Sequence, residues 1–188
     1  MAELHLQAAP ALGGFTLTLG ENRIEERADL ALVSVATPSG GETTLARAFE
    51  DNWQLSLPGA SCSSVNGDLR AIRTAPDQLM LMFAHATPDA AQVISDRLQG
   101  AGYVTDQTDA WVILEISGPA TLSALERICP LDLDPAGFPV DAAARTAFEH
   151  MGAMMVRLSD TRFLLLSARS SAVSFLHAVE TSYRFVLP

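Results

Sequence analysis

The feature that most constrains the fold of this chain is an internal repeat with an offset of roughly 80 residues. Each half of the 188-residue sequence shows the same order of patterns: an apolar strand, a short helix, a loop, two strands around a tight turn, and a longer helix. The turn at 75–77 in the first half corresponds to the turn at 159–161 in the second. This order predicts an α+β fold built from two tandem ferredoxin-like, split β-α-β-type repeats.

The repeat sets the expected domain organisation. We expect the first repeat at 28–105 and the second at 106–188, together forming one compact domain, because neither half alone is long enough to bury a comfortable core. The first 27 residues combine Pro10, Gly13-Gly14 and a charged run at 21–27 without a helical or strand period. They are therefore interpreted as an N-terminal arm.

Individual elements follow from periodicity and from turn residues. One helix is predicted to begin at a Thr87 cap and to stop at Gly100, a second to open at Gly118, and a last one to begin at Ser170 or Ser171. The expected strands are 30–36, 69–74, 78–83, 103–106, 111–116, 145–149, 153–158 and 162–167, a short helix is expected at 44–49, and a final extended piece at 183–187. The predicted core of the second repeat is Trp111, Ile113, Leu122, Leu125, Phe163, Leu165 and Leu176.

Charge and composition exclude several classes of function. All 12 cationic residues are arginines, so neither a P-loop lysine nor a Schiff-base lysine exists in this chain. The net charge of -10 opposes binding to nucleic acid. No apolar stretch approaches the ~20 residues that cross a bilayer, and the first residues lack a cationic signal region, so we expect a soluble, cytoplasmic protein with no membrane contact.

The residues able to carry chemistry do not form a recognisable motif. The candidates are His5, His85, His150, His177, Cys62 and Cys129. Their spacing fits no metal site or Cys-x-x-Cys pair, and we expect Cys129 to be packed and His177 to be a surface or boundary residue. The glycines at 100 and 102 lack the third glycine of a dinucleotide turn and are interpreted as a helix stop. We therefore predict no catalytic, cofactor-binding or metal-binding residue in this chain.

Two groups of residues leave alternatives open. Asp132, Asp134, Asp141 and Glu149 surround the proline-rich loop of the second half and form either an acidic rim near a ligand or, as we favour, a solvated loop. Met151, Met154 and Met155 belong either to the core, which we favour, or to an adaptable partner surface.

An ordered set of short motifs runs through the second half of the sequence. It consists of Asp106-Gln107-Thr108-Asp109-Ala110-Trp111-Val112-Ile113-Leu114-Glu115-Ile116-Ser117-Gly118-Pro119, followed by Cys129-Pro130-Leu131-Asp132-Leu133, Ala144-Arg145-Thr146 and Arg169-Ser170. This set resembles the gamma subunits of heterotetrameric sarcosine oxidases. In the first half the resemblance is looser and covers 71–79, with Ala75 where a glycine and Leu79 where an aromatic residue is expected.

The resemblance implies a fold similar to the folate-binding domain of glycine-cleavage aminomethyltransferases, which agrees with the repeat. It also implies a non-catalytic assembly subunit that has alpha, beta and delta partners. The complex would demethylate sarcosine to glycine with FAD, FMN and NAD on its larger subunits, zinc in delta, and tetrahydrofolate as one-carbon acceptor. A subunit of this kind should expose an apolar contact surface, for which 12–19 and 183–187 are candidates.

Two other functions stay open at this point. One is a free-standing folate-binding protein or one-carbon transferase of the same fold. The other is a gamma-like subunit of a different N-methyl amino-acid dehydrogenase, such as one acting on N-methylglutamate.

The helix face around Leu125 provides a first test of the predicted core. Leu125→Ala is expected to lower the free energy of unfolding by about 2 to 5 kcal/mol, because a buried leucine loses both its transfer energy and its packing. Chemical denaturation measures the loss. A change below about 1 kcal/mol would place this residue outside the core.

Overall fold

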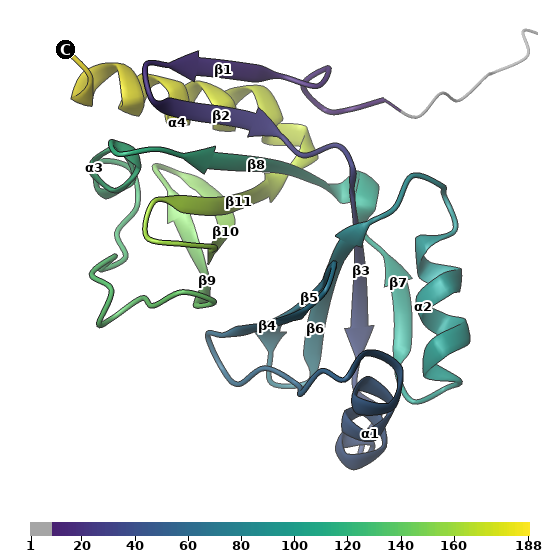
Figure 1. Ribbon diagram of the computed structural model, residues 1–188. Helices are drawn as coiled ribbons and strands as arrows, with labels where there is room; N and C mark the ends of the chain where they lie inside the picture. The colour runs from purple at the N-terminus through teal and green to yellow at the C-terminus, as the bar shows by residue number, and fades with distance from the viewer. Residues whose placement is uncertain (1–8) are drawn as a thin grey trace, which may run out of the picture.

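The computed structural model describes residues 9–188, which fold into two antiparallel sheets with helices on their outer sides (Figure 1). His5 lies outside the described residues. The elements are β1 (Thr16–Leu19), β2 (Asn22–Glu26), β3 (Leu30–Ala36), α1 (Glu42–Trp53), β4 (Ser63–Asn66), β5 (Leu69–Ala75), β6 (Gln78–Ala84), α2 (Ala90–Leu98), β7 (Tyr103–Asp106), the 3-10 turn η1 (Thr108–Ala110), β8 (Trp111–Ser117), α3 (Thr121–Glu126), β9 (Ala143–Phe148), β10 (Met151–Arg157), β11 (Arg162–Ala168), the 3-10 turn η2 (Arg169–Ser171) and α4 (Ala172–Val186).

The strand orders confirm the predicted duplication. The five-stranded sheet has the order β4-β5-β6-β3-β7, and the six-stranded sheet has the order β9-β10-β11-β8-β2-β1. In the first sheet Val33 pairs with Leu81, and at the equivalent place in the second Leu114 pairs with Leu165. The two sheets therefore share one plan, and the predicted α+β class with two tandem repeats is confirmed.

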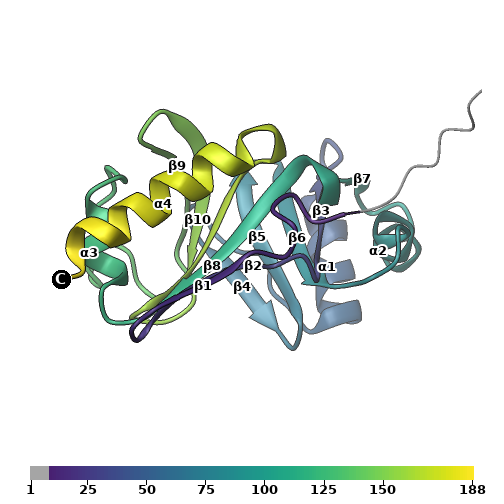
Figure 2. The same cartoon turned by 90° about the horizontal axis from the view of Figure 1, so that it is seen from above.

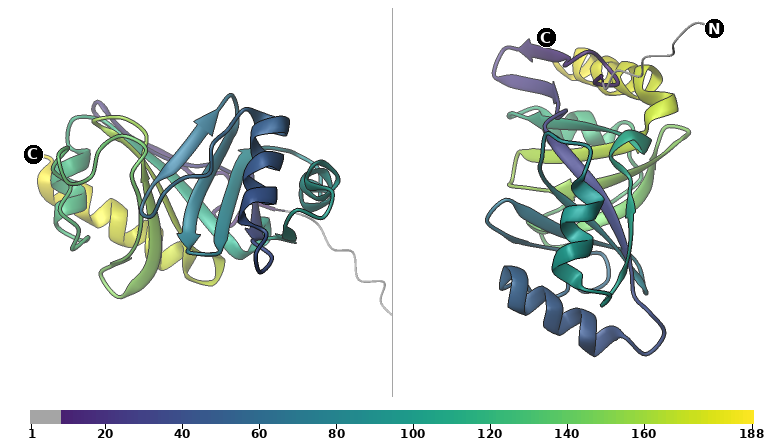
Figure 3. Two further views of the ribbon diagram at one scale, coloured as in Figure 1. Left: turned by 90° about the horizontal axis from the view of Figure 1, so that it is seen from below. Right: turned by 90° about the vertical axis from the view of Figure 1, so that its right-hand side faces the viewer.

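The two sheets face each other, and each carries its helices on the opposite side (Figures 2 and 3). Alternate residues of one strand reach different cores: Val33 packs under α1 and α2, whereas Leu32 packs against the other sheet. In the same way, Leu114 faces α3 and α4, and Ile113 faces the first sheet. Because both faces are buried, the central strands are apolar almost throughout instead of alternating.

The N-terminal segment differs from the expected arm. Residues 16–26 form the β1–β2 hairpin, and β2 pairs antiparallel with β8, so the expectation of irregular structure is wrong for this stretch. In the first repeat β7 follows α2 and pairs with β3. The second repeat has no strand after α4 among the described residues, and β2 takes the position beside β8 that β7 takes beside β3.

Buried polar groups hold this hairpin in place. The Glu26 side chain, 8% exposed, accepts hydrogen bonds from the backbone N–H groups of Leu12 (2.9 Å), Gly14 (2.7 Å) and Phe15 (3.3 Å). Asn22 accepts a bond from the N–H of Ala120 (2.9 Å), just before α3. The hairpin is thereby tied to the second repeat by side chains as well as by strand pairing.

The C-terminal end also differs from the prediction. Residues 183–186 continue α4 instead of forming an extended piece. Tyr183 is fully buried, its hydroxyl lies 2.8 Å from the Thr121 hydroxyl, and burial raises the pKa of Tyr183 to about 12. The helical conformation is favoured because it places this phenol against α3 and leaves Phe185 on the outer side of the helix.

Smaller corrections concern helix starts and burial. Helix α2 begins at Ala90, and Thr87 does not cap it, because its hydroxyl bonds the Asp89 carboxylate instead of a backbone N–H. Ser171 stands at the N-cap position of α4 without a side-chain cap bond. Of the seven predicted core residues, Trp111 and Leu122 are only partly buried at the margins of their clusters, and the other five are buried.

Gly118 generates a prediction about the hairpin. Its φ is +123°, and a Cβ there would lie 2.6 Å from the Asn22 Cα and 2.7 Å from the Glu21 carbonyl oxygen. We expect Gly118→Ala to cost about 3 kcal/mol or more, because the β1–β2 turn must move away from α3. The matched control is Gly20→Ala, with φ +60° and open space around its Cβ, expected to cost about 1 kcal/mol. Equal losses in thermal or chemical unfolding would contradict the close-approach explanation.

Candidate functional site

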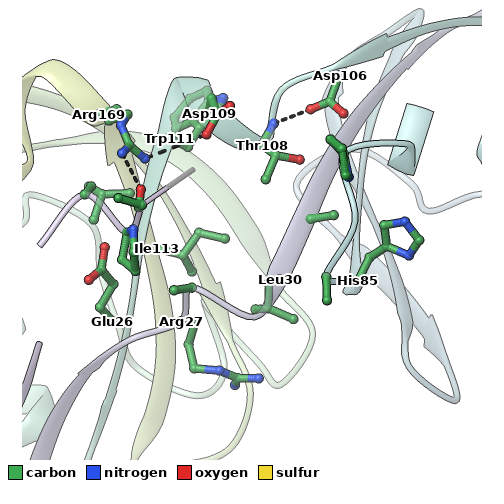
Figure 4. A pocket seen from close by; sticks show the side chains of 18 of the residues that line it. Glu26, Arg27, Leu30, His85, Asp106, Thr108, Asp109, Trp111, Ile113 and Arg169 are labelled. Atoms are coloured by element: carbon green, nitrogen blue, oxygen red, sulfur yellow. Dashed lines mark hydrogen bonds and ion pairs between the residues drawn. The ribbon is translucent and has the colours of Figure 1, made fainter. Parts of the chain in front are cut away.

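The main candidate site is a cleft of about 520 Å³ where the two repeats meet. Its walls come from the N-terminal segment at 9–11, the β2–β3 connection, the β6–α2 loop and the stretch from β7 through η1 to β8 (Figure 4). Apolar lining is supplied by Leu30, Trp111 and Ile113. Among the charged side chains, the figure labels Glu26, Arg27, Asp106, Asp109 and Arg169 around the space.

At one wall of the cleft, His85, Thr87 and Asp89 form a hydrogen-bonded group. His85 Nε2 lies 2.7 Å from Asp89 Oδ1 and 3.0 Å from the Thr87 hydroxyl, which itself donates to Asp89. The bonds from Thr87 and then from His85 hold the pKa of Asp89 below its ordinary value. A carboxylate with a lowered pKa is a poor general base at neutral pH. The group orders the start of α2.

Arg27 also lines the cleft and is bound by two carboxylates. Its Nε and Nη2 donate to Asp29 (2.8 and 2.7 Å), and its Nη1 donates to Glu115 on β8, which also accepts bonds from Arg162. Burial alone would raise the pKa of Glu115, but the bonds from Arg162 and Arg27 outweigh burial and lower it. The Arg27 guanidinium therefore links the β2–β3 connection to β8.

The remaining cation, Arg169, connects three segments. Its Nη2 donates to the carbonyl of Ala9 (2.6 Å), and its Nη1 lies 3.9 Å from Asp109, as the dashed lines in Figure 4 mark. Arg169 thus brings η2, η1 and the N-terminal segment together. In the part of the chain that the structure describes, each arginine lining this cleft has a partner within the protein.

The candidates from the sequence are not brought together. Cys129 is buried with its Sγ 3.8 Å from the Thr146 hydroxyl, Cys62 is exposed, and neither forms a disulfide. His177 is exposed on α4, and His150 is exposed in the β9–β10 turn. Residues 9–188 contain no group of three or more His, Cys, Asp or Glu side chains arranged to hold a metal ion.

The acidic loop and the methionines have defined places. Asp132 and Asp134 are exposed and accept bonds from backbone N–H groups within their own loop, and Glu149 is exposed in a turn. Asp141 pairs with Arg70 of the first repeat at 2.6 Å. Met154 and Met155 are buried and Met151 is partly buried, as the favoured core interpretation expects.

Sequence reasoning missed the buried polar groups, of which Arg157 is the least exposed charged side chain. This side chain is 1% exposed, and its guanidinium donates to the carbonyls of Leu133 (3.1 Å) and Phe138 (2.8 Å) while lying 5.3 Å from the Phe163 ring centre. It fixes the proline-rich loop against the sheet. An arginine after the apolar run 153–156 was the available signal, but its partners lie in a loop that sequence periodicity does not position.

Comparison with known proteins supports the resemblance found in the sequence. No family model matches the chain. The sarcosine oxidase subunit gamma of Corynebacterium sp. strain P-1 is 29% identical over 175 residues, covering 92% of this chain and 84% of that protein. The subunit of the same name from strain U-96 is 28% identical over 180 residues, covering 92% and 82%.

Solved structures give the same result for the fold. A chain of the heterotetrameric sarcosine oxidase from Corynebacterium sp. U-96 matches with a TM-score of 0.76 and 23% identity, covering 90% of this chain and 89% of that one. The aminomethyltransferase T of Bartonella henselae matches with a TM-score of 0.53 and 13% identity, covering 82% and 44%. The chain is thus similar in sequence to sarcosine oxidase gamma subunits and in fold to a chain of the solved heterotetramer, and the predicted resemblance of its fold to aminomethyltransferases is confirmed.

The Glu115 network generates a pH prediction. Because the folded pKa of Glu115 lies below its ordinary value, its stabilisation is present above the unfolded pKa of about 4.3 and is lost as pH falls through the folded pKa. Glu115→Gln should cost about 1 to 3 kcal/mol near neutral pH, because two guanidinium groups lose a charged acceptor. In this variant the free energy of unfolding should also fall less steeply as the pH drops below about 4.3.

Chemical denaturation at a series of pH values measures both effects. The control is Glu50→Gln, an exposed residue on α1, expected to change stability by less than about 0.5 kcal/mol. An unchanged acid profile in Glu115→Gln would show that this carboxylate does not contribute to the pH dependence.

Proposed function

We propose that this chain is the gamma subunit of a heterotetrameric sarcosine oxidase and that it acts there as a non-catalytic structural subunit. The observation that carries the proposal is the similarity to curated gamma subunits, which extends over 92% of the chain and 84% of the relative. The match is therefore to a whole subunit and not to one shared motif. Agreement of the fold with a chain of the solved heterotetramer supports it.

The use of the polar side chains supports the structural role. Glu26 holds the N-terminal segment, and Arg157 holds the proline-rich loop. Arg27 and Glu115 join the β2–β3 connection to β8, and Arg169 joins the N-terminal segment to the second repeat. Each of these groups stabilises the fold through partners inside the chain. The proposal therefore assigns no catalytic, cofactor-binding or metal-binding residue to this subunit.

The proposal places the chemistry on the partner subunits. In the complex, sarcosine is oxidatively demethylated to glycine, and the one-carbon unit passes to tetrahydrofolate. Removal of a hydride from an N-methyl amine requires a redox cofactor. By the resemblance to sarcosine oxidases, the larger subunits of the complex carry FAD, FMN and NAD, and delta carries zinc. The complex is proposed to lie in the cytoplasm. In residues 9–188 no helix has the length and apolar character to cross a membrane.

Comparison of the isolated chain with the assembled complex tests the proposal. The purified chain is expected to show no flavin absorption and no sarcosine-dependent formation of peroxide, whereas co-expression with alpha, beta and delta subunits should give a stable, active complex containing all four chains. Omitting this chain should lower the recovery of the complex, because a subunit that binds only the folded assembly stabilises it by mass action.

Specific results would contradict the proposal. A flavin spectrum or turnover by the isolated chain would exclude a purely structural role. Saturable binding of tetrahydrofolate without partners would favour a free-standing folate protein. Activity of the complex on N-methylglutamate but not on sarcosine would identify a related dehydrogenase.

A further inference from the structure

One wall of the cleft between the repeats is a segment that belongs to neither sheet. Residues 9–14, called here the N-terminal strap, precede β1, and residues 9–11 line the cleft. No side chain of the strap is buried, and only Ala11 and Leu12 are partly buried, at the border of the core under α3 and α4. Segments with so little buried apolar surface open at a lower free-energy cost than core strands.

Two charged side chains that line the cleft hold the strap by its main chain. The Glu26 carboxylate is buried, and its oxygens accept separate bonds, Oε1 from the Leu12 N–H and Oε2 from the Gly14 N–H. At the start of the strap, Arg169 donates to the Ala9 carbonyl at 2.6 Å, as Figure 4 marks. The strap is part of no helix or strand, so its position depends on these bonds.

Two glycines form the junction between the strap and the β1–β2 hairpin. Gly13 and Gly14 have φ values of +70° and +76°, and a Cβ at either position would have no atom within 4 Å. Glycine is therefore favoured here by the backbone conformation and not by close packing. Directly after them, the Phe15 carbonyl accepts a bond of 2.8 Å from the Glu26 N–H, so the chain is fixed in the sheet from residue 15 onwards.

Movement of the strap removes a wall of the cleft without separating the repeats. Among residues 9–188, the apolar cluster between the two sheets includes no residue of the strap. Leu30 and Trp111, which line the cleft, are only partly buried while the strap is in place. Ordering a segment that contains two glycines costs conformational entropy, which opposes the closed position. The bonds from Glu26 and Arg169 offset that cost.

We infer that the N-terminal strap is a lid on the cleft, latched closed by Glu26 and hinged at Gly13-Gly14. The lid opens as a local unit while both sheets stay folded. In the open state the Glu26 carboxylate and the Arg169 guanidinium lose their main-chain partners and face the cleft, so opening exposes one negative and one positive group together. This inference is independent of the proposed function, because it concerns contacts within one chain.

Amide hydrogen exchange of the full chain, followed by NMR at several low urea concentrations, tests whether the strap opens locally. Exchange of the Leu12 and Gly14 N–H groups should stay within about two-fold as urea is added, because a local opening exposes little new surface. Exchange of Val33 and Leu81, which pair in the middle of the first sheet, should accelerate with urea, because it requires unfolding of the sheet.

Two pairs of variants test the latch and the hinge. Glu26→Gln should accelerate exchange of the Leu12 N–H about ten-fold or more, because an amide has one acceptor oxygen where the carboxylate uses two. Glu25→Gln, an equal change of charge on a partly exposed neighbour, should stay within about two-fold. Gly14→Ala should also accelerate this exchange, and Gly40→Ala, with a φ of +71° and equally open space in the β3–α1 connection, should not.

A thiol placed in the cleft reports whether opening of the strap uncovers it. Val112 lines the cleft, is 1% exposed and belongs to the core that Ala11 and Leu12 border. The thiol introduced by Val112→Cys, in a chain whose exposed Cys62 is replaced by serine, should react with a soluble thiol reagent about ten-fold faster when Glu26→Gln is added, in step with the faster exchange of the strap. Adding Glu25→Gln instead should leave the labelling rate within about two-fold.

Each part of the inference has a result that overturns it. Equal urea dependence of the strap and core amides would show that the strap opens only when the whole chain unfolds. Unchanged exchange of Leu12 in both Glu26→Gln and Gly14→Ala would remove the latch and the hinge. Faster exchange of the strap without faster labelling at position 112 would show that the strap is not a lid on the cleft.

Discussion

The apolar contact between the two sheets is the interaction on which the rest of the structure depends. Leu32, Met80 and Met82 of the first sheet and Ile113, Met154 and Leu164 of the second belong to one buried cluster. Because this contact covers the inner faces, the helices of each repeat have only the outer faces left to bury. Separation of the two sheets would expose the apolar side chains of this cluster to water.

The N-terminal hairpin adds a second constraint, since it completes the sheet of the distant repeat. The chain runs from β2 at the second sheet directly into β3 of the first. Arg27 and Asp29 lie in that short connection, and Glu115 on β8 binds the same guanidinium. Backbone bonds at the other end of the molecule, from Ser63 to Asp141 (2.7 Å), join the sheets again. The two repeats are consequently joined at both ends.

The charged side chains around the cleft bind groups of the same protein. Around the cleft between the repeats, Glu26, Arg27 and Arg169 all bind groups of the same protein, and this geometry stabilises the fold. At the end of α4, by contrast, Phe185 is 69% exposed. Paired charges of this kind position the segments that they connect.

The sequence by itself determined the duplicated plan, the β5–β6 and β10–β11 hairpins and the apolar strand β8, because period, turn residues and apolar runs act within a few residues. It also showed that the histidines and cysteines lack metal spacing. Tertiary structure alone decided that residues 16–26 are strands, since β2 pairs with β8 about 90 residues later. It likewise decided that 183–186 are helical, because the Tyr183 hydroxyl finds Thr121 inside the core. The ion pair of Arg27 with Glu115 and the cleft where the repeats meet could not be predicted from the sequence for the same reason: segments far apart in the chain meet only after the sheets have packed.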